Sequence, residues 1–450
     1  MGSDRSAGNG PARGRGALSL LLLASALVLL SLRLFALVDR HAVDLPAADQ
    51  WDLYAAFMEP HDAWELFRWQ HPPVRQGVGM WVLDAANRLT RWNARAHSFA
   101  IAGILVLCCL AACVLKWKLF GRLHASDFAI PLIVLTTAQY QTLVVVPNPA
   151  HSALPLLLVL LTVLALVSLR EPWRTAAIAL LLFAAVHTGF GQLLPPVVAG
   201  VLALHLRRAP EPGRRAIRAG AAAGIAAALV SIGVFLAGFD FFSSADCFEW
   251  ISGDVFMIPA FVCIAFARFV GVGFQRFGLL ASAAGLLVAA AAFALFARSL
   301  RDEWKGAPDD RVRDANLILL GFSLLFVTAA AWGRVCLSPM TGESSRYMTL
   351  LIPAFLALYF ASLQSSRRIW TAILIAGVVL GSLPVGIGSG HPAADRSDRA
   401  RRWRACYLAT RDIETCNART LYSVHPNPQQ TRLREKLDYL ERNRLSLFAD

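Results

Sequence analysis

Two aspartates and a histidine lie close together in the polar stretch that follows the first long apolar block. Asp49 and Asp52 flank Trp51, and His71 precedes two prolines in the sequence WQHPPVRQG. A carboxylate can act as a general base on a hydroxyl group, or bind a metal ion beside a phosphate. A histidine held in an extended turn by prolines can donate to a phosphate or transfer a proton. The alternative is an ordinary solvated loop, and the residue types alone leave both interpretations open.

Several arginines are candidates for binding the oxygens of a phosphate group. Arg75 follows the two prolines, and a late loop, GRVCLSPMTGESSRYMT, contains Arg334 and Arg346, with Tyr347 next to the second arginine. A guanidinium can bind two phosphate oxygens at once. The alternative is that these arginines only anchor helix ends at the membrane surface.

Two further ionisable residues are candidates for a polar site. His187 lies in an apolar segment, AAVHTGFGQ, and Glu343 lies in the late loop. An ionisable group within a membrane segment is a functional candidate by default, although His187 could equally lie at the outer surface. No cysteine or histidine cluster has zinc spacing. No motif supports ATP hydrolysis, hydride transfer or zinc proteolysis.

The elements that must position these residues are membrane helices. The chain has 450 residues, of which 56% are hydrophobic and only 16% charged, whereas a soluble domain carries about 25% charged residues. The apolar residues form long blocks, and the first, 16–37, is interrupted only by Arg33. About 20 such residues in a helix cross a hydrocarbon layer of roughly 30 Å. Because a backbone in lipid must satisfy its own hydrogen bonds, the sequence predicts an all-α, polytopic transmembrane bundle.

About 11–12 hydrophobic segments are expected within a membrane domain that covers 17–388, after a disordered N-terminus, 1–16. We interpret the first segment as a retained anchor and not as a cleaved signal. We interpret 254–274 as a partial or interfacial helix, because a charge such as Arg268 at the bilayer centre costs at least ~2.5–3.5 kcal/mol. The other expected spans are 17–38, 98–116, 128–146, 152–169, 175–190, 192–206, 219–238, 276–297, 316–332, 348–364 and 369–388.

Two polar regions flank or interrupt this membrane domain. The first external loop, 39–97, is rich in tryptophan, and 62–69 and 76–92 are expected to be helices that lie on the outer leaflet. The C-terminal tail, 389–450, is soluble in character and contains an amphipathic helix at about 429–442. We expect the tail to form a small cap on the membrane domain.

The basic residues indicate the orientation of the chain. Net charge is +13, but the lysines and arginines lie mainly in short loops between apolar blocks. This is the positive-inside pattern of a bacterial inner-membrane protein, and it removes the reason to expect nucleic acid as a partner. The N-terminus is then cytoplasmic. The tail is periplasmic unless 254–274 spans fully, which would move the tail to the cytoplasm.

The cysteines bear on the same question. In a periplasmic tail, Cys406 and Cys416 are expected to form a disulfide. Cys247 and Cys336 lie in two loops assigned to the outer side, and they are a weaker second pair.

In the order of its parts, the chain resembles the GT-C superfamily of membrane glycosyltransferases, including the lipid A aminoarabinose transferase and protein O-mannosyltransferase families. The similar motifs are Asp49 in ADQWDLY, the turn in WQHPPVRQG, the Ser-Arg-Tyr loop in GRVCLSPMTGESSRYM, the stretch FMIPAFVCIAFARFVGVGF and the ending RNRLSLFAD. The resemblance covers most of the chain in the order of its segments, but only a few short motifs match in sequence. It departs at the family's paired acidic residues, because Asp-Gln-Trp-Asp stands here in place of Asp-Glu or Asp-Asp-Trp.

The resemblance implies a transferase that takes a sugar from a polyprenyl phosphate in the bilayer and passes it to a periplasmic glycan, lipid or protein. Asp49 would be the base or metal contact with Asp52 as its substitute, His71 the turn histidine and Arg346 the phosphate contact. A divalent metal stays open as a cofactor because the adjacent second carboxylate is missing. The competing hypotheses are a flippase or transporter of lipid-linked glycans, a protein like an O-antigen polymerase or ligase, and a scaffold without catalysis.

Overall fold

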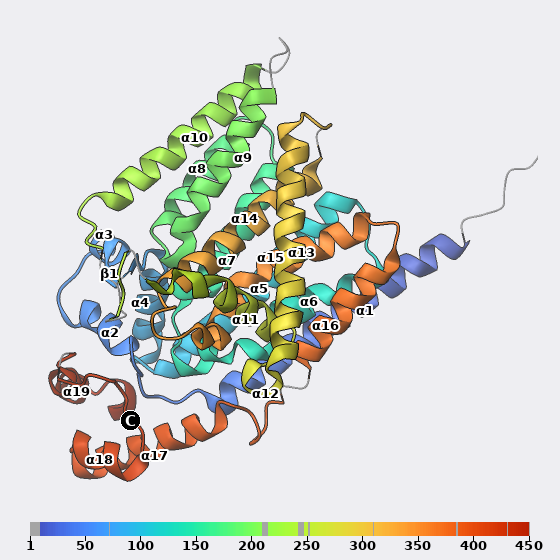
Figure 1. Ribbon diagram of the computed structural model, residues 1–450. Coiled ribbons are helices and arrows are strands. Elements are labelled where there is room, and N and C mark those ends of the chain that lie inside the picture. Colours follow the sequence, from blue (N-terminus) through green and yellow to red (C-terminus); the bar gives the residue numbers. More distant parts are fainter. Residues whose placement is uncertain are drawn as a thin grey trace, which may run out of the picture.

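The computed structural model (Figure 1) describes residues 10–71, 73–208, 215–241, 247–250, 253–308, 310–383, 386–429 and 431–449. Within these ranges, seven helices are long and apolar enough to cross a membrane, and five shorter apolar helices accompany them. The prediction of an all-α, multi-pass membrane protein is therefore confirmed. The helices of the membrane domain are α1(Gly10–His41), α5(Ala94–Phe120), α6(Ala129–Val134), α7(Ala153–Ser168), α8(Trp173–Val186), α9(Leu194–Arg208), α10(Arg215–Leu236), α11(Ile258–Phe269), α12(Phe274–Phe277), α13(Leu279–Trp304), α14(Arg311–Trp332), α15(Met348–Gln364) and α16(Arg368–Ser382).

Helices α14 and α15 form the centre of the bundle. In their most apolar stretches 78% and 72% of the residues are buried, against 22% in α13. Both helices pack on α7 and on each other. The low burial of α13 leaves large side chains such as Leu287 exposed, as expected for a helix that faces lipid.

Two segments differ from a simple row of spans. Helix α11 has 12 residues, or about 18 Å, and is too short to cross the bilayer, in agreement with the partial helix expected at 254–274. Helix α1 begins at Gly10, inside the segment 1–16 that was expected to be disordered. Residues 1–9 lie outside the described part of the chain.

The expected span 128–146 is wrong as a single helix. Helix α6 ends at Val134, and a 3-10 turn (Thr137–Gln139) and a π-helical turn (Gln141–Val145) follow. The interruption coincides with the polar run TTAQYQT, in which the Gln139 amide donates to the Val134 carbonyl at 2.8 Å. Side chains that bond to nearby backbone groups offer an alternative to the helix ladder.

The first loop and the tail pack against each other at one end of the bundle (Figure 1). Trp51 and Tyr54 of the loop share a hydrophobic core with Trp403 and Leu437 of the tail. The three helices expected in these regions are present as α3, α4 and α19, although each is shorter than predicted, whereas α2, α17 and α18 were not foreseen. The helices of the two regions are α2(Gln50–Met58), α3(Ala63–Arg68), α4(Val78–Thr90), α17(Ala394–Thr410), α18(Ile413–Thr420) and α19(Leu433–Arg442).

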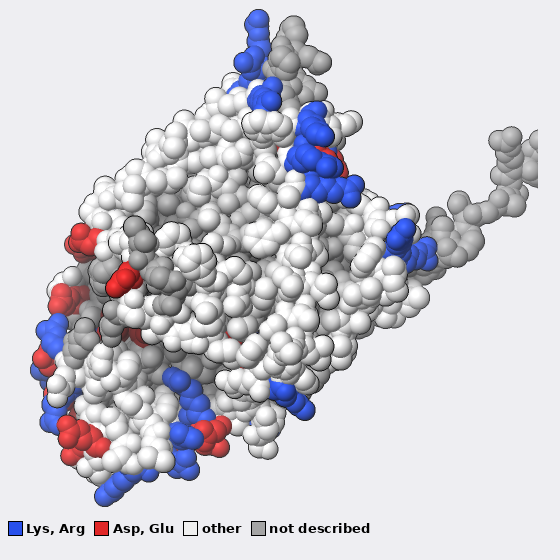
Figure 2. Space-filling model, in the orientation of Figure 1, with Lys and Arg blue, Asp and Glu red and all other residues white. Residues whose placement is uncertain are grey.

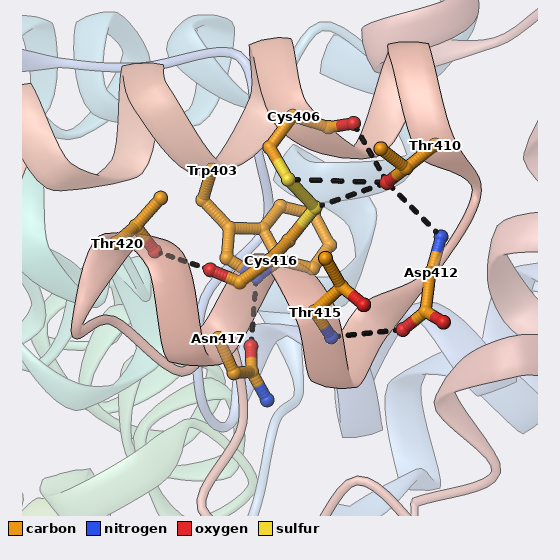
Figure 3. The surroundings of a disulfide bond; sticks show 8 residues. All are labelled: Trp403, Cys406, Thr410, Asp412, Thr415, Cys416, Asn417 and Thr420. Carbon is orange, nitrogen blue, oxygen red and sulfur yellow. Dashed lines mark hydrogen bonds between the residues drawn. A yellow bond between two sulfur atoms is a disulfide. The ribbon is translucent and has the colours of Figure 1, made fainter.

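The tail contains a disulfide between Cys406 and Cys416, with the Cα atoms 5.7 Å apart, and this bond joins α17 to α18 (Figure 3). Beside it, the indole of Trp403 donates to the Asn417 side chain at 2.7 Å. A second disulfide joins Cys247 to Cys336, which are 89 residues apart. It links the segment that follows α10 to the segment that follows α14. Both pairs are those expected from the sequence.

Charged residues gather at opposite ends of the face shown in Figure 2, with a broad uncharged belt between them. Lysine and arginine predominate where α9, α13 and α16 approach the connecting loops, whereas both signs are mixed around α17 to α19. This belt, together with the apolar helices, fits a protein that spans a membrane.

Candidate active site

Asp49 and His71 meet on one side of a cavity of about 660 Å³ at the end of the bundle that carries the first loop. The Nε2 atom of His71 lies 4.0 Å from Oδ2 of Asp49. The Asp49 side chain lines the cavity and is 48% exposed, whereas that of His71 is 14% exposed. The carboxylate is therefore accessible to a ligand, and the less exposed imidazole lies beside it.

A small antiparallel hairpin positions His71. Its strands are β1(Gln70–His71) and β2(Val74–Arg75), and His71 pairs with Val74. The Trp69 ring stacks on His71 with the ring centres 6.2 Å apart. Pro72 lies outside the described residues, and Pro73 lines the cavity. The hairpin thus holds the histidine, as expected from the His-Pro-Pro sequence.

Asp52 is bound by the C-terminal tail. The Thr431 hydroxyl donates to Asp52 Oδ1 at 2.6 Å, and Nζ of Lys436 lies 3.8 Å from the same oxygen. Nε2 of His425 lies 3.5 Å from Oδ2. Lys436 also donates to the backbone carbonyl of Trp51 at 2.6 Å. Asp52 does not line the cavity, so its position next to Asp49 depends on the tail.

Asp49, Asp52 and His71 nevertheless form a group of potential metal ligands. One ligand atom from each lies within 4.8 Å of the others. Ligands around one divalent ion at about 2.1 Å are themselves separated by about 3–3.5 Å, so small side-chain rotations would bring these three into range. Two carboxylates and an imidazole are a donor set suited to Zn²⁺ or Mn²⁺.

Three arginines from distant parts of the chain line the cavity together with Asp49. Arg334 follows α14, Arg346 lies in a 3-10 turn (Ser345–Tyr347), and Arg396 belongs to α17. Burial, followed by the neighbouring Arg346, lowers the pKa of Arg334, while Tyr347 and Asp49 oppose the shift. Positive charges held this close favour an anion between them.

The broken segment after α6 fixes the Ser-Arg-Tyr turn. The side-chain oxygen of Gln141 accepts from the Arg346 backbone N–H at 3.2 Å and also from the Ser344 hydroxyl. The Arg346 guanidinium contacts the hydroxyl of buried Tyr347 at 3.3 Å. Arg346 itself is exposed, so its backbone is fixed while its charge remains available.

His151 is a cavity residue that sequence reasoning missed. The Asn148 amide donates to Oε1 of Gln76 at 3.0 Å, so the Gln76 amide nitrogen must be the donor in its 3.0 Å contact with Nε2 of His151. Burial, and then the neighbouring His71, lowers the pKa of His151 to about 3. The ring is therefore neutral at physiological pH, and its proton is on Nδ1.

A glycine permits the close packing behind His151. Gly189 has φ +55°, and a Cβ atom there would lie 1.6 Å from the Ala150 carbonyl oxygen. Any side chain would displace the 3-10 turn (Pro149–His151) that carries the histidine.

Asp52 and His71 do not themselves line the cavity, and three more residues that the sequence suggested also lie outside its lining. Arg75 is buried and donates to four carbonyls, among them Phe235 at 3.1 Å and Ala237 at 2.9 Å, which close the end of α10. His187 packs against Phe67 and Phe183 at the end of α8. Glu343 lies beside Gly273 and Arg268. The structure therefore uses Arg75 to hold backbone, and it gives His187 and Glu343 no contact with the cavity.

The rest of the cavity wall is mostly apolar and includes several aromatic side chains. Phe190 and Phe326 pack edge to face with ring centres 5.2 Å apart, and Trp332 is partly exposed beside them. Phe241 and Trp250, 4.6 Å apart, form the wall on the side of the Cys247–Cys336 disulfide. The cavity therefore joins an apolar surface to a positively charged end.

The chain matches no protein-family model, no curated protein and no solved structure.

Proposed function

We propose that this chain is a membrane glycosyltransferase of the GT-C type, which moves a sugar from a polyprenyl-phosphate donor to a glycan, lipid or protein acceptor. The observation that supports it best is the content of one cavity: an accessible carboxylate, Asp49, together with three arginines and an aromatic wall at the end of a membrane bundle. A lipid-linked sugar phosphate needs each of these features.

In this proposal the arginines bind the donor phosphate. Arg334 and Arg346 come from the loop between α14 and α15, and Arg396 approaches from the tail. The isoprenoid would lie along Phe190 and Phe326. Guanidinium groups stabilise the negative charge that grows on the phosphate as the sugar leaves. Stabilisation of this kind is usually the largest single contribution to lowering the activation barrier of the transfer.

Asp49 acts as the base. Its carboxylate takes the proton from the acceptor hydroxyl, whose oxygen forms the new bond to the anomeric carbon of the sugar. The bond from that carbon to the phosphate oxygen breaks, and its electron pair stays on the polyprenyl phosphate. Asp49, Asp52 and His71 would hold a divalent ion if the enzyme uses one, and such an ion would add Lewis-acid stabilisation of the phosphate.

The proposed location is the periplasmic face of a bacterial inner membrane. The tail packs on the first loop, so both lie on the same side of the bundle, and the two disulfides belong to an oxidising compartment. The N-terminus would be cytoplasmic.

The test compares purified wild type with Asp49→Asn, using radiolabelled polyprenyl-phosphate sugars and membrane acceptors. Asp395→Asn is a matched control, because Asp395 is exposed on α17 and lies outside the cavity lining. We expect a loss of turnover of about 10²-fold or more in Asp49→Asn only. Equal turnover in all three proteins would remove Asp49 from its role. The absence of turnover with every donor, combined with movement of the lipid-linked sugar across proteoliposome membranes, would favour a transporter.

A further inference from the structure

A second cavity of about 650 Å³ lies where the first loop meets the tail. Its lining comes from the end of α1, the turn between α4 and α5, helix α17 and the last residues of the chain. None of these lining residues belongs to the wall of the candidate active site. The charged residues that line it are Asp39, Asp44, Arg91, Arg95, Arg401 and Arg404.

The two carboxylates of this cavity are already engaged. Asp39 accepts from the Arg95 guanidinium at 2.8 Å. Asp44 Oδ1 accepts from the Ala94 backbone N–H at 2.8 Å and from the Ser446 hydroxyl at 3.1 Å. Burial raises the pKa of Asp44, while its hydrogen bonds and the nearby charges of Arg404 and Arg95 oppose this shift.

Two of the four arginines have no acidic partner within 4 Å among the described residues. These are Arg91 and Arg404. Among the described residues, the side chain of Arg404 hydrogen-bonds only to the Leu447 carbonyl, at 3.4 Å, and its Nε atom is buried without a hydrogen-bond partner. A buried guanidinium N–H without a partner is costly, and an anion in the cavity would satisfy it.

The position of the cavity indicates where this anion comes from. Asp39 lies in the last turn of one span (Ala17–His41), and Arg95 lies in the first turn of another (Ala94–Phe120). Residues at the ends of spans lie at the level of the lipid headgroups. The exposed apolar side chain of Leu408 also lines the cavity, which suits a molecule with both a phosphate and a hydrocarbon part.

We propose that this cavity binds a phosphate group, supplied by the headgroup of an anionic membrane lipid. Arg91 and Arg404 are its main ligands, and the bound lipid fills the junction between the first loop and the tail. This inference does not rest on the proposed transferase activity, because it requires only binding.

The experiment uses the full-length protein in detergent with two probes. In one arm, retention of phosphatidylglycerol against phosphatidylcholine is measured by native mass spectrometry. In the other, binding of inorganic phosphate is measured by calorimetry. The variants are Arg404→Gln and Arg91→Gln. Arg402→Gln is the matched control, because this exposed arginine also lies on α17 but does not line the cavity.

We expect phosphatidylglycerol binding to weaken about tenfold in Arg404→Gln and in Arg91→Gln, and to be unchanged in Arg402→Gln. Binding of inorganic phosphate alone, with no preference for phosphatidylglycerol, would overturn the lipid assignment. Equal loss in Arg402→Gln would show general surface attraction and overturn the site itself. Because Arg91 is exposed, its replacement tests the proposal even if Arg404→Gln folds poorly.

Discussion

Among the described residues, two clusters each combine one histidine with two carboxylates, in very different settings. Asp49, Asp52 and His71 lie at the end that carries the first loop, and the second cluster joins three helix ends elsewhere in the bundle. In the second cluster, His205 of α9 lies 3.2 Å from Asp314 of α14. In the first, His71 and Asp49 are 4.0 Å apart.

The difference between the clusters is one of access and partners. The side chain of Glu303, the third member of the second cluster, is fully buried and accepts from Arg313 Nε at 2.6 Å. Asp49, by contrast, is half-exposed on a cavity. A carboxylate whose charge is matched inside the protein stabilises the fold, whereas one that faces a cavity can act on a ligand. Residue type alone therefore does not identify a site.

The largest expected effect is on the stability of the protein, through the second cluster of His205, Glu303 and Asp314. Glu303→Gln leaves the Arg313 charge without its buried partner, and we expect the free energy of unfolding to fall by about 3 kcal/mol. Asp49→Asn should change it by less than about 0.5 kcal/mol, because its side chain is half-exposed. Chemical unfolding in a mild detergent measures both. The comparison fails if the two variants are equally destabilised.

The next effect is on turnover. We expect His71→Gln to lower the transfer rate by about 10²-fold, since the imidazole supports the Asp49 carboxylate. His205→Gln should leave the rate per folded molecule unchanged. Rates are normalised to the folded fraction from size-exclusion chromatography. A rate loss of the same size in His205→Gln would mean that the clusters communicate and are not separate in function.

The sequence predicts the positions of most membrane spans well. The lengths of the apolar blocks are dictated by the thickness of the bilayer, so most spans could be located from composition alone. The span 128–146 could not, because Thr and Gln side chains replace helix hydrogen bonds with local ones. That break is part of the site, since Gln141 fixes the turn that carries Arg346.

The site residues were predicted less completely, and for a physical reason. Asp49, His71 and Arg346 stand in recognisable local motifs, whereas Arg396 and His151 reach the cavity only through the packing of distant segments. Arg75 shows the opposite error. It is close to His71 in the sequence, yet its guanidinium is taken up by the carbonyls at the end of α10.

A smaller effect is expected from the tail contact that distinguishes Asp52 from Asp49. Lys436→Met removes the buried ammonium that donates to the Thr431 hydroxyl and to the Trp51 carbonyl. Because Thr431 in turn donates to Asp52, the Asp52 carboxylate is then less firmly positioned. We expect turnover to fall about tenfold with little change in donor KM, because a positioning defect affects the chemical step. Lys436→Arg should restore part of the rate. A change in KM alone would instead indicate that the tail acts on donor binding.

The last effect depends on pH and concerns the neutral ring of His151. The pKa of this ring is about 3 in the folded protein and about 6.5 in an unfolded chain. The unfolded state therefore takes up the proton first as the pH falls below about 6.5, and His151 lowers the free energy of unfolding progressively down to about pH 3. His151→Gln cannot take up this proton, so its free energy of unfolding should fall less between pH 7 and pH 4, by about 1 kcal/mol per pH unit. Thermal unfolding at a series of pH values measures the two slopes. Parallel slopes would mean that His151 takes up its proton equally in the folded and unfolded states, and the lowered pKa of the buried ring would then be wrong.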